Sequence, residues 1–498
     1  MNVLHVVAPV ALSALTVVGA LTAAPGFLDS RVAGGGAVMD STDSALRADS
    51  LKHAPSDTFT PPMLGPSLRY GVDTMISPCV DFYQYVNGDW RAKTKLGTLA
   101  KGESKWVDVF SDMDRRIRLH IQALLDSASA VAATTTDPTL RVLGTFYGRC
   151  LVADSLERFP GARARAQTTK TPVKDSTRAE QCVQRTRQTL GGALGQAFAQ
   201  DLLGTSQAKP RMEALLEALR AAAIELVQGN RWMTAAEKDV ARDRLLKLKL
   251  RVGIPAQRVD YAPLVLTNDY RENKKTIANF GTQRMVNAIG GDIREQWKMS
   301  LLRLNASYLP GEHAIEVPAV MFLPPFFDVN AEDAFNFAGV GYIIGHEIIH
   351  SVAGQLWTIE HPQLQQNIET FKRLNSELGE VDGWGTNGQR TFSEDIADHG
   401  GLLIAYAAWK AMLKTHKTPL APLVDGYMPD QRFLLGVAQV WRGKWFEWPG
   451  GRYNRDVHAA PFARVNGVMM NVPQFAKAFG CKEGDPMVRP AGKRPVIW

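Results

Sequence analysis

The sequence predicts a mainly helical protein of the α+β class with a small β-sheet. Three observations carry this prediction. Apolar residues recur at three- to four-residue spacing in several stretches between residues 107 and 251, short proline-punctuated β-prone stretches follow Leu301, and two further long helical patterns come after them. With 498 residues, 45% of them hydrophobic and 21% charged, the chain can bury a substantial core and is long enough for more than one domain.

The N-terminal segment has the composition of an export signal. The first 28 residues carry no charged side chain, and residues 6–24 are almost entirely apolar. Residues 1–24 are therefore expected to be a signal peptide, although only His5 replaces the usual Lys or Arg, so a retained N-terminal membrane anchor is the alternative. Residues 25–66, rich in Gly, Ser, Asp and Pro, are expected to be a disordered linker. The mature protein is then periplasmic, cell-surface or secreted.

The formal net charge of +7 raises the question of nucleic-acid binding. Lys and Arg are spread along the chain with Asp and Glu between them, and the densest basic stretch, residues 247–251, is interpreted as a solvated helix face. We therefore expect no nucleic-acid partner.

The middle of the chain is predicted to be helical. Order is expected to begin near Tyr70, and a polar loop is expected over residues 154–176. Thr234 and Glu237 have the spacing of a capping box, and Gly253 is a stop signal for the helix that follows them. The predicted helices cover residues 107–128, 181–203, 212–228 and 235–251.

The pattern changes after Leu301. The stretches LNASYLP and AIEVPAVMFLPPFF are extended and bounded by prolines, which predicts a pair of strands. Beyond them, residues 333–354 and 394–414 are predicted to form two long helices.

The first of these helices contains GHEIIHS. His346 and His350 are four residues apart, so both imidazoles project from one helix face and can bind one metal ion, with Glu347 beside them. The competing interpretation is a buried helix with two hydrogen-bonded histidines.

The second helix offers a third ligand. A catalytic zinc usually takes three protein ligands, and in SEDIADHGG Glu394 and Asp398 lie one helical turn apart. Glu394 could bind the metal while Asp398 accepts the N–H of a ligand histidine. The alternative is a solvated acidic helix start with Ser393 as its N-cap.

Together these motifs resemble the neprilysin-like zinc metallopeptidases, family M13, of the bacterial endopeptidase O type. GHEIIH and EDIADHGG are preceded by NASY and PPFF and followed by DVHAAPFARVNG and a terminal IW. Nearer the N-terminus, DFYQYVNGDW and RWMTAAEKDVARDRL also resemble family segments.

The resemblance implies one Zn²⁺ per chain, bound by His346, His350 and Glu394, with Glu347 as general base and Asp398 supporting a ligand. It also implies that His458 donates to the oxyanion of the transition state. The resemblance further implies that Asn305 and Ala306 hold the peptide backbone and that Arg464 binds a substrate carbonyl or carboxylate. An apolar pocket for the residue after the scissile bond is expected from Phe326, Ile343 and Trp441.

The resemblance also implies the disulfides. Four cysteines in an exported chain indicate two disulfides, and their spacing alone leaves three pairings open. In animal members of the family the corresponding pairs are Cys79 with Cys481 and Cys150 with Cys182.

The implied architecture is a thermolysin-like gluzincin catalytic domain with a small sheet and a reduced all-helical lobe. Its catalytic domain is expected to be discontinuous, built from residues 67–115 and 291–498, with the lobe at 116–290. Family members are longer, and the short segment between Cys150 and Cys182 leads to the hypothesis of a more open cleft. Ser307 also stands where the family commonly has Phe.

The predicted function is that of an exported zinc metalloendopeptidase that cleaves peptides on the amino side of apolar residues. The alternative is a catalytically degenerate zinc- or peptide-binding member of the same fold. Intact Glu347 favours the enzyme, because a binding scaffold needs the histidines but has no use for the base.

Overall fold

The computed structural model describes residues 69–96, 106–153, 177–204, 207–289, 297–356, 361–415, 422–445 and 456–498. The predicted leader and linker and the predicted polar loop at 154–176 lie outside these ranges. Among the described helices, none combines the length and apolar character needed to cross a membrane.

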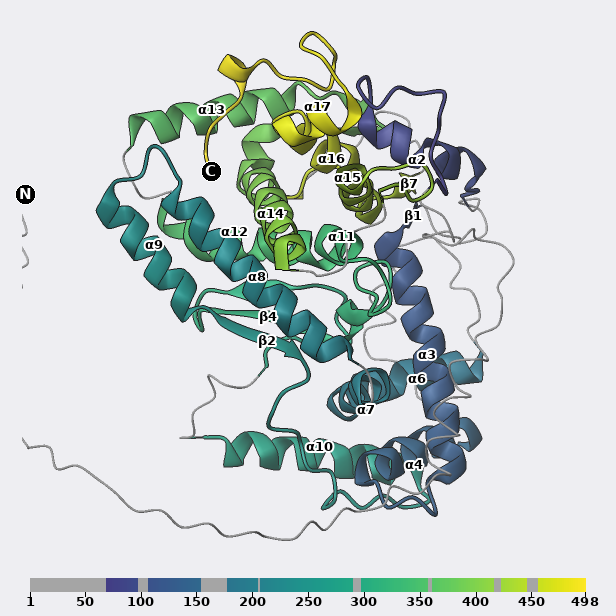
Figure 1. Ribbon diagram of the computed structural model, residues 1–498. Helices are drawn as coiled ribbons and strands as arrows, with labels where there is room; N and C mark the ends of the chain where they lie inside the picture. Colours follow the sequence, from purple (N-terminus) through teal and green to yellow (C-terminus); the bar gives the residue numbers. More distant parts are fainter. Residues whose placement is uncertain are drawn as a thin grey trace, which may run out of the picture. The chain divides into compact units, whose positions relative to one another are not determined.

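Helices dominate the described chain, as predicted (Figure 1). They are α2 (Phe82–Lys93), α3 (Val109–Val131), α4 (Pro138–Val152), α6 (Arg178–Thr189), α7 (Gly191–Leu203), α8 (Ala208–Gln228), α9 (Ala235–Lys247), α10 (Tyr270–Asn287), α11 (Asp333–Asn336), α12 (Tyr342–Leu356), α13 (Pro362–Ser376), α14 (Gly388–Thr415), α15 (Pro429–Val440), α16 (Pro461–Met469) and α17 (Pro473–Phe479). The strands are β1 (Trp106–Asp108), β2 (Lys249–Gly253), β3 (Ser307–Leu309), β4 (Ala314–Pro318), β5 (Glu380–Val381), β6 (Trp384–Gly385) and β7 (Gly443–Trp445).

The largest sheet in the described chain has the strand order β2-β4-β3. Strands β3 and β4 are antiparallel, which confirms the strand pair predicted after Leu301. β2 joins the other edge of β4 in parallel, so the prediction of a helix continuing to residue 251 is wrong. Arg251 is buried in β2, where its guanidinium pairs with Glu312 at 2.6 Å and Glu316 at 2.9 Å. The basic stretch is therefore not a solvated helix face.

Other helix predictions differ in detail from the structure. The predicted helix over residues 181–203 is two helices, α6 and α7, because the chain leaves helical geometry at Leu190 before Gly191 and Gly192. The capping box of Thr234 and Glu237 is confirmed at the start of α9. The helical run predicted from residue 333 contains a π-helical turn, Phe337–Gly341, between α11 and α12.

The described helices pack around two hydrophobic clusters. The first unites α8, α9, α12, α14 and α15 with the three-stranded sheet. The second lies between α4, α6, α7 and α10, which form the lower bundle in Figure 1. Helix α3 serves both, since Val109 and Met113 belong to the first cluster and Ile117, Ile121 and Leu125 to the second. The proposed division into a catalytic domain and a helical lobe follows these clusters only in part, because α8 packs on α14.

The predicted disulfides are confirmed. Cys79 bonds to Cys481 across 402 residues, and Cys150 bonds to Cys182 across 32. The first ties the segment before α2 to the C-terminal part of the chain. The second joins α4 to α6 in the helical bundle.

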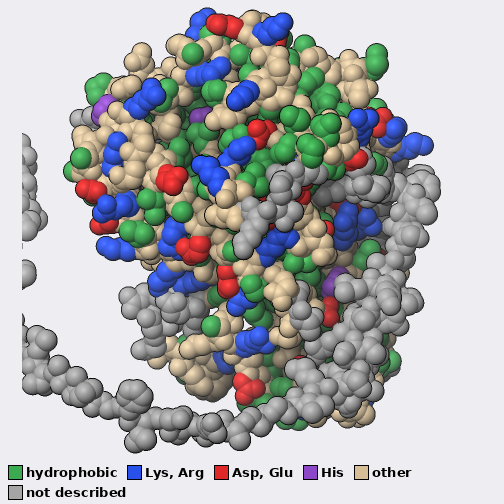
Figure 2. Space-filling view, viewed as in Figure 1, with side chains coloured by type: hydrophobic (Ala, Val, Ile, Leu, Met, Phe, Trp, Pro, Cys, Tyr) green, Lys and Arg blue, Asp and Glu red, His purple; other side chains and the backbone are tan. Residues whose placement is uncertain are grey.

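Side-chain charges on the face shown in Figure 2 are interspersed. Lys and Arg lie scattered over this face, with Asp and Glu between them.

Candidate metal centre and adjoining cleft

Two helices meet closely at the predicted metal site. An ideal Cβ on Gly401 of α14 would lie 2.6 Å from the backbone nitrogen of His346, and one on Gly345 of α12 would lie 2.7 Å from the carbonyl oxygen of Gly401. Only glycine fits such an approach. The glycines therefore bring α14, which carries Glu394, against α12, which carries the histidines.

The three predicted ligands converge. His346 Nε2 lies 2.9 Å from His350 Nε2 and 3.1 Å from Glu394 Oε2, and His350 Nε2 lies 3.4 Å from the same oxygen. α14 begins at Gly388, not at Glu394, and the Asn387 side chain accepts the N–H of Arg390 at its start. The alternative in which Ser393 caps a solvated helix start is therefore wrong.

These residues fit a zinc ion. Their ligand atoms all lie within 4.8 Å of one another, and among the described residues the buried Glu394 Oε2 accepts no well-aligned hydrogen bond, although both imidazoles lie close to it. Two imidazole nitrogens and one carboxylate oxygen are a usual ligand set of catalytic zinc and leave a coordination position open. The group can therefore hold Zn²⁺ and leave room for a water molecule or a substrate.

The charges of these three side chains and their neighbours are those of a cation site. Burial by itself lowers the pKa of His346, but the hydrogen bond and charge of Asp398, with a contribution from Glu394, raise it to about 9. Burial raises the pKa of Glu394, but the two histidines outweigh burial and hold it far below its usual value. This balance of charges favours binding of a cation between the three side chains.

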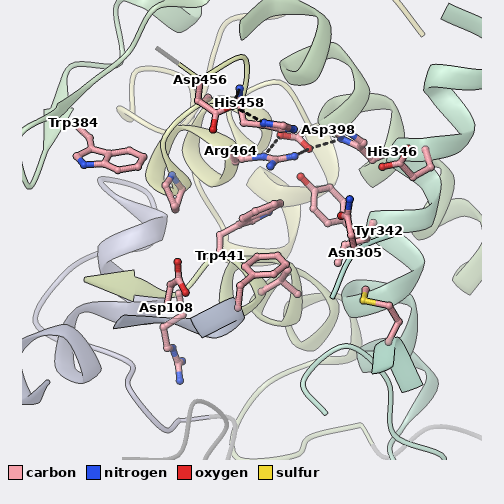
Figure 3. A pocket seen from close by; sticks show the side chains of 18 of the residues that line it. Asp108, Asn305, Tyr342, His346, Trp384, Asp398, Trp441, Asp456, His458 and Arg464 are labelled. Atoms are coloured by element: carbon pink, nitrogen blue, oxygen red, sulfur yellow. Dashed lines mark hydrogen bonds and ion pairs between the residues drawn. The ribbon is translucent and has the colours of Figure 1, made fainter. Parts of the chain in front are cut away.

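Asp398 supports the centre from behind. Its Oδ1 lies 2.7 Å from His346 Nδ1, and Arg464 donates from Nε to Oδ2 and from Nη2 to Oδ1, both at 2.6 Å (Figure 3). Burial raises the pKa of Asp398, but Arg464 and His346 lower it to about 2. The Arg464 guanidinium lies 3.8 Å from the centroid of the Trp441 ring. The carboxylate therefore stays charged and fixes the tautomer of His346.

We expect Asp398→Asn to weaken zinc binding by about 10- to 100-fold, because a neutral amide orients the ligand histidine less well. It also leaves the buried Arg464 without its counter-charge, which costs about 3–5 kcal/mol of folding free energy. Asp395→Asn is the matched control, because burial raises the pKa of Asp395 to about 7 and its carboxylate bonds to Thr391 instead. Chelator competition and thermal unfolding measure both effects, and unchanged zinc affinity in Asp398→Asn would contradict the assignment.

Glu347 and His458 both line the cavity beside the centre. Glu347 Oε2 accepts the backbone N–H of Tyr308 on β3 at 2.7 Å. His458 Nε2 lies 3.4 Å from Glu394 Oε2, and its Nδ1 lies 2.8 Å from Asp456 Oδ1. His458 is about half exposed, with 48% of its side-chain surface accessible. Both predicted catalytic side chains thus border the metal centre.

A cavity of about 290 Å³ opens beside these residues (Figure 3). Predicted site residues that line it are Asn305, Ile343, His346, Glu347, Asp398, Trp441, His458 and Arg464. Ala306 and Phe326 are buried and are absent from this lining. The ring centroid of Phe326 instead lies 5.4 Å from that of Phe110. Phe110 lines the cavity, and its ring centroid lies 5.9 Å from that of Trp441.

Sequence reasoning missed several lining residues. Tyr342 lies one helical turn before His346, so helical spacing could have identified it. Phe110, Trp384 and Trp445 come from segments joined only by tertiary contacts, including the pairing of β1 with β7. No local pattern marks these three residues.

Comparison with known proteins places the chain among zinc peptidases of one family. Two models described as peptidase family M13 match the chain, one over residues 305–494 and the other over residues 78–166 and 159–255. Human endothelin-converting enzyme 1 is 28% identical over 333 residues, 62% of this chain and 43% of its own length. Human membrane metallo-endopeptidase-like 1 is 27% identical over 341 residues, 63% of this chain and 44% of its own length. The matched region thus spans less than half of either relative.

Solved structures share the fold. An inhibitor complex of Mycobacterium tuberculosis zinc metalloprotease Zmp1 superposes with a TM-score of 0.67 at 20% identity, covering 86% of this chain and 98% of that one. PepO from Lactobacillus rhamnosis gives a TM-score of 0.54 at 20% identity, covering 92% and 72%.

Fold and site together define a mainly helical gluzincin, with its two histidines on α12 and its glutamate on α14. Within that class, the chain belongs to peptidase family M13. The predicted fold class and the family resemblance are confirmed.

Proposed function

We propose that the protein is an exported zinc-dependent metalloendopeptidase that hydrolyses peptide bonds on the amino side of apolar residues. The observation that carries this proposal is the convergence of His346, His350 and Glu394 into one ligand group, with His346 and Glu347 lining the adjoining cavity. Two disulfides support export, because such bonds persist in oxidising compartments.

Glu347 is the general base in this proposal. Zinc, when bound, supplies a Lewis acid that polarises the scissile carbonyl and makes water nucleophilic at neutral pH. Because Tyr308 N–H holds Oε2 of Glu347, Oε1 is the oxygen that takes the proton from the attacking water. The same carboxyl group then gives the proton to the leaving amine.

His458 stabilises the negative charge that develops on the carbonyl oxygen. Asp456 Oδ1 lies 2.8 Å from Nδ1 and orients the ring, and Nε2 is the nitrogen proposed to face the oxyanion. Arg464 uses Nε and Nη2 to bind Asp398, and Nη1 takes part in neither bond, so it is the nitrogen proposed to contact a substrate carbonyl or carboxylate.

The cavity sets the proposed cleavage preference. Asn305 holds the peptide backbone, with the buried Ala306 next to it in the chain, while Ile343, Trp441 and Phe110, which packs on Phe326, receive an apolar side chain after the scissile bond. Burying such a side chain contributes about 1.5–3 kcal/mol.

The test is hydrolysis of quenched peptides of graded length by the purified chain, with a chelator and then with added zinc. We expect cleavage before apolar residues. This cleavage should disappear with the chelator and return when zinc is added. Zinc binding without cleavage of any peptide would overturn the proposed peptidase activity and indicate a binding protein. Cleavage restricted to short peptides would count against the more open cleft proposed for the reduced lobe.

A further inference from the structure

A closed ring of hydrogen bonds lies next to the catalytic base but outside the cavity lining. Its members are Arg244 on α9, Tyr308 on β3, and His313 in the turn between β3 and β4. Arg244 Nη2 lies 2.7 Å from Tyr308 Oη, Tyr308 Oη lies 3.0 Å from His313 Nδ1, and His313 Nε2 lies 2.7 Å from the carbonyl oxygen of Arg244.

Chemistry fixes the direction of each bond. The Arg244 carbonyl has no proton to give, so His313 Nε2 carries one and donates it. Nδ1 of the neutral ring is then an acceptor for the Tyr308 hydroxyl proton, and the Tyr308 oxygen accepts from the Arg244 guanidinium. Each group donates to the next, and such a ring restricts all three side chains to one arrangement.

The ring is hydrogen-bonded at two points to α12, the helix that carries Glu347. Arg244 Nε donates to the carbonyl oxygen of Ser351, the residue after the ligand His350 on α12. Tyr308 donates its backbone N–H to Glu347 Oε2 at 2.7 Å. Helix α9 packs against α12 (Figure 1), and α12 packs against β3. One arginine thus joins the helix that carries the base to the strand whose amide orients the base.

We propose that Arg244, acting through Tyr308 and His313, is a positioning residue that fixes edge strand β3 against α12 and so aims the Glu347 carboxylate. The proposal rests on the proposed peptidase function. It explains why a half-buried hydroxyl, an imidazole and a guanidinium gather outside the cavity lining. General-base catalysis is sensitive to displacements of about 1 Å, so loosening β3 lowers turnover without removing a group that contacts substrate.

Tyr308→Phe tests the ring, because it removes one hydroxyl and keeps the backbone amide. Its matched control is Tyr147→Phe, since the buried Tyr147 hydroxyl donates to Asp126 at 2.8 Å in the helical bundle. Tyr308→Phe and Arg244→Met are each expected to lower kcat about tenfold with KM changed less than about twofold and zinc content unchanged. Tyr147→Phe should leave kcat unchanged. The double variant should be no slower than Arg244→Met, because both changes break one unit.

Hydrogen–deuterium exchange of the zinc-loaded protein supplies a readout that does not depend on turnover. The Tyr308 amide should exchange about tenfold faster in Tyr308→Phe and Arg244→Met than in the wild type or in Tyr147→Phe. If the wild type cleaves peptides and both variants match Tyr147→Phe in kcat and in exchange at Tyr308, the positioning role is overturned while the peptidase stands. If the wild type cleaves nothing and the exchange still rises, the ring holds β3 and the peptidase fails.

Discussion

Glu347→Gln is expected to lower kcat for peptide hydrolysis by about 10³-fold while one zinc ion remains bound. The amide has no charge with which to take a proton from water, so the general-base step is lost. Its carbonyl oxygen can still accept the Tyr308 N–H, so β3 and α12 keep their arrangement. The ligand atoms of His346 and His350 are unaffected by the change.

The measurement pairs turnover of a quenched peptide with zinc content by mass spectrometry. Glu369→Gln is the control, because Glu369 lies exposed on α13 and pairs only with Lys372 among its described contacts. The control should keep both zinc and turnover. A zinc-loaded Glu347→Gln protein that cleaves at the wild-type rate would transfer the role of base to another group.

Local sequence patterns predicted the parts of the site that lie on single helices. His346 and His350 face one ion because helical geometry places residues four apart on one face, and the same rule relates Glu394 to Asp398. Family resemblance placed His458 and Arg464 beside them, and the structure brings both to the cavity. That Asp398 binds both His346 and Arg464 depends on the approach of α12, α14 and α16, which no local pattern specifies.

Other features that the sequence did not predict depend on contacts between distant segments. Residues 249–253 alternate charged and apolar side chains after a good helix, and their strand conformation depends on β4 and on two carboxylates more than 60 residues away. Phe110 reaches the cavity through α3, whose start is held by the pairing of β1 with β7. The ring centroids of Trp384 and Trp445 lie 5.5 Å apart, which is another contact between distant segments. Packing of this kind depends on pairs of segments, so the periodicity of residues within one segment does not predict it.

Glu394→Gln is expected to reduce zinc affinity by at least about 100-fold, because it removes the negative charge among the three ligands. In wild-type protein, zinc at a concentration 100 times its Kd should stabilise the fold by about 2.7 kcal/mol, a shift that thermal unfolding detects. The variant should lose most of this stabilisation at the same zinc concentration. Glu394→Asp keeps the charge but shortens the side chain by one methylene, so it should bind zinc more tightly than Gln and more weakly than Glu.

The response to excess zinc separates the ligand from the base. Peptide hydrolysis by Glu394→Gln should recover in part as zinc is raised, because mass action refills a weakened site that still has His346, His350 and Glu347. Glu347→Gln has no such route, since its metal is already bound and its proton acceptor is missing. Recovery of both variants with zinc would assign Glu347 to metal binding. Full zinc affinity in Glu394→Gln would exclude Glu394 as the third ligand, and a replacement ligand would then be sought near His458.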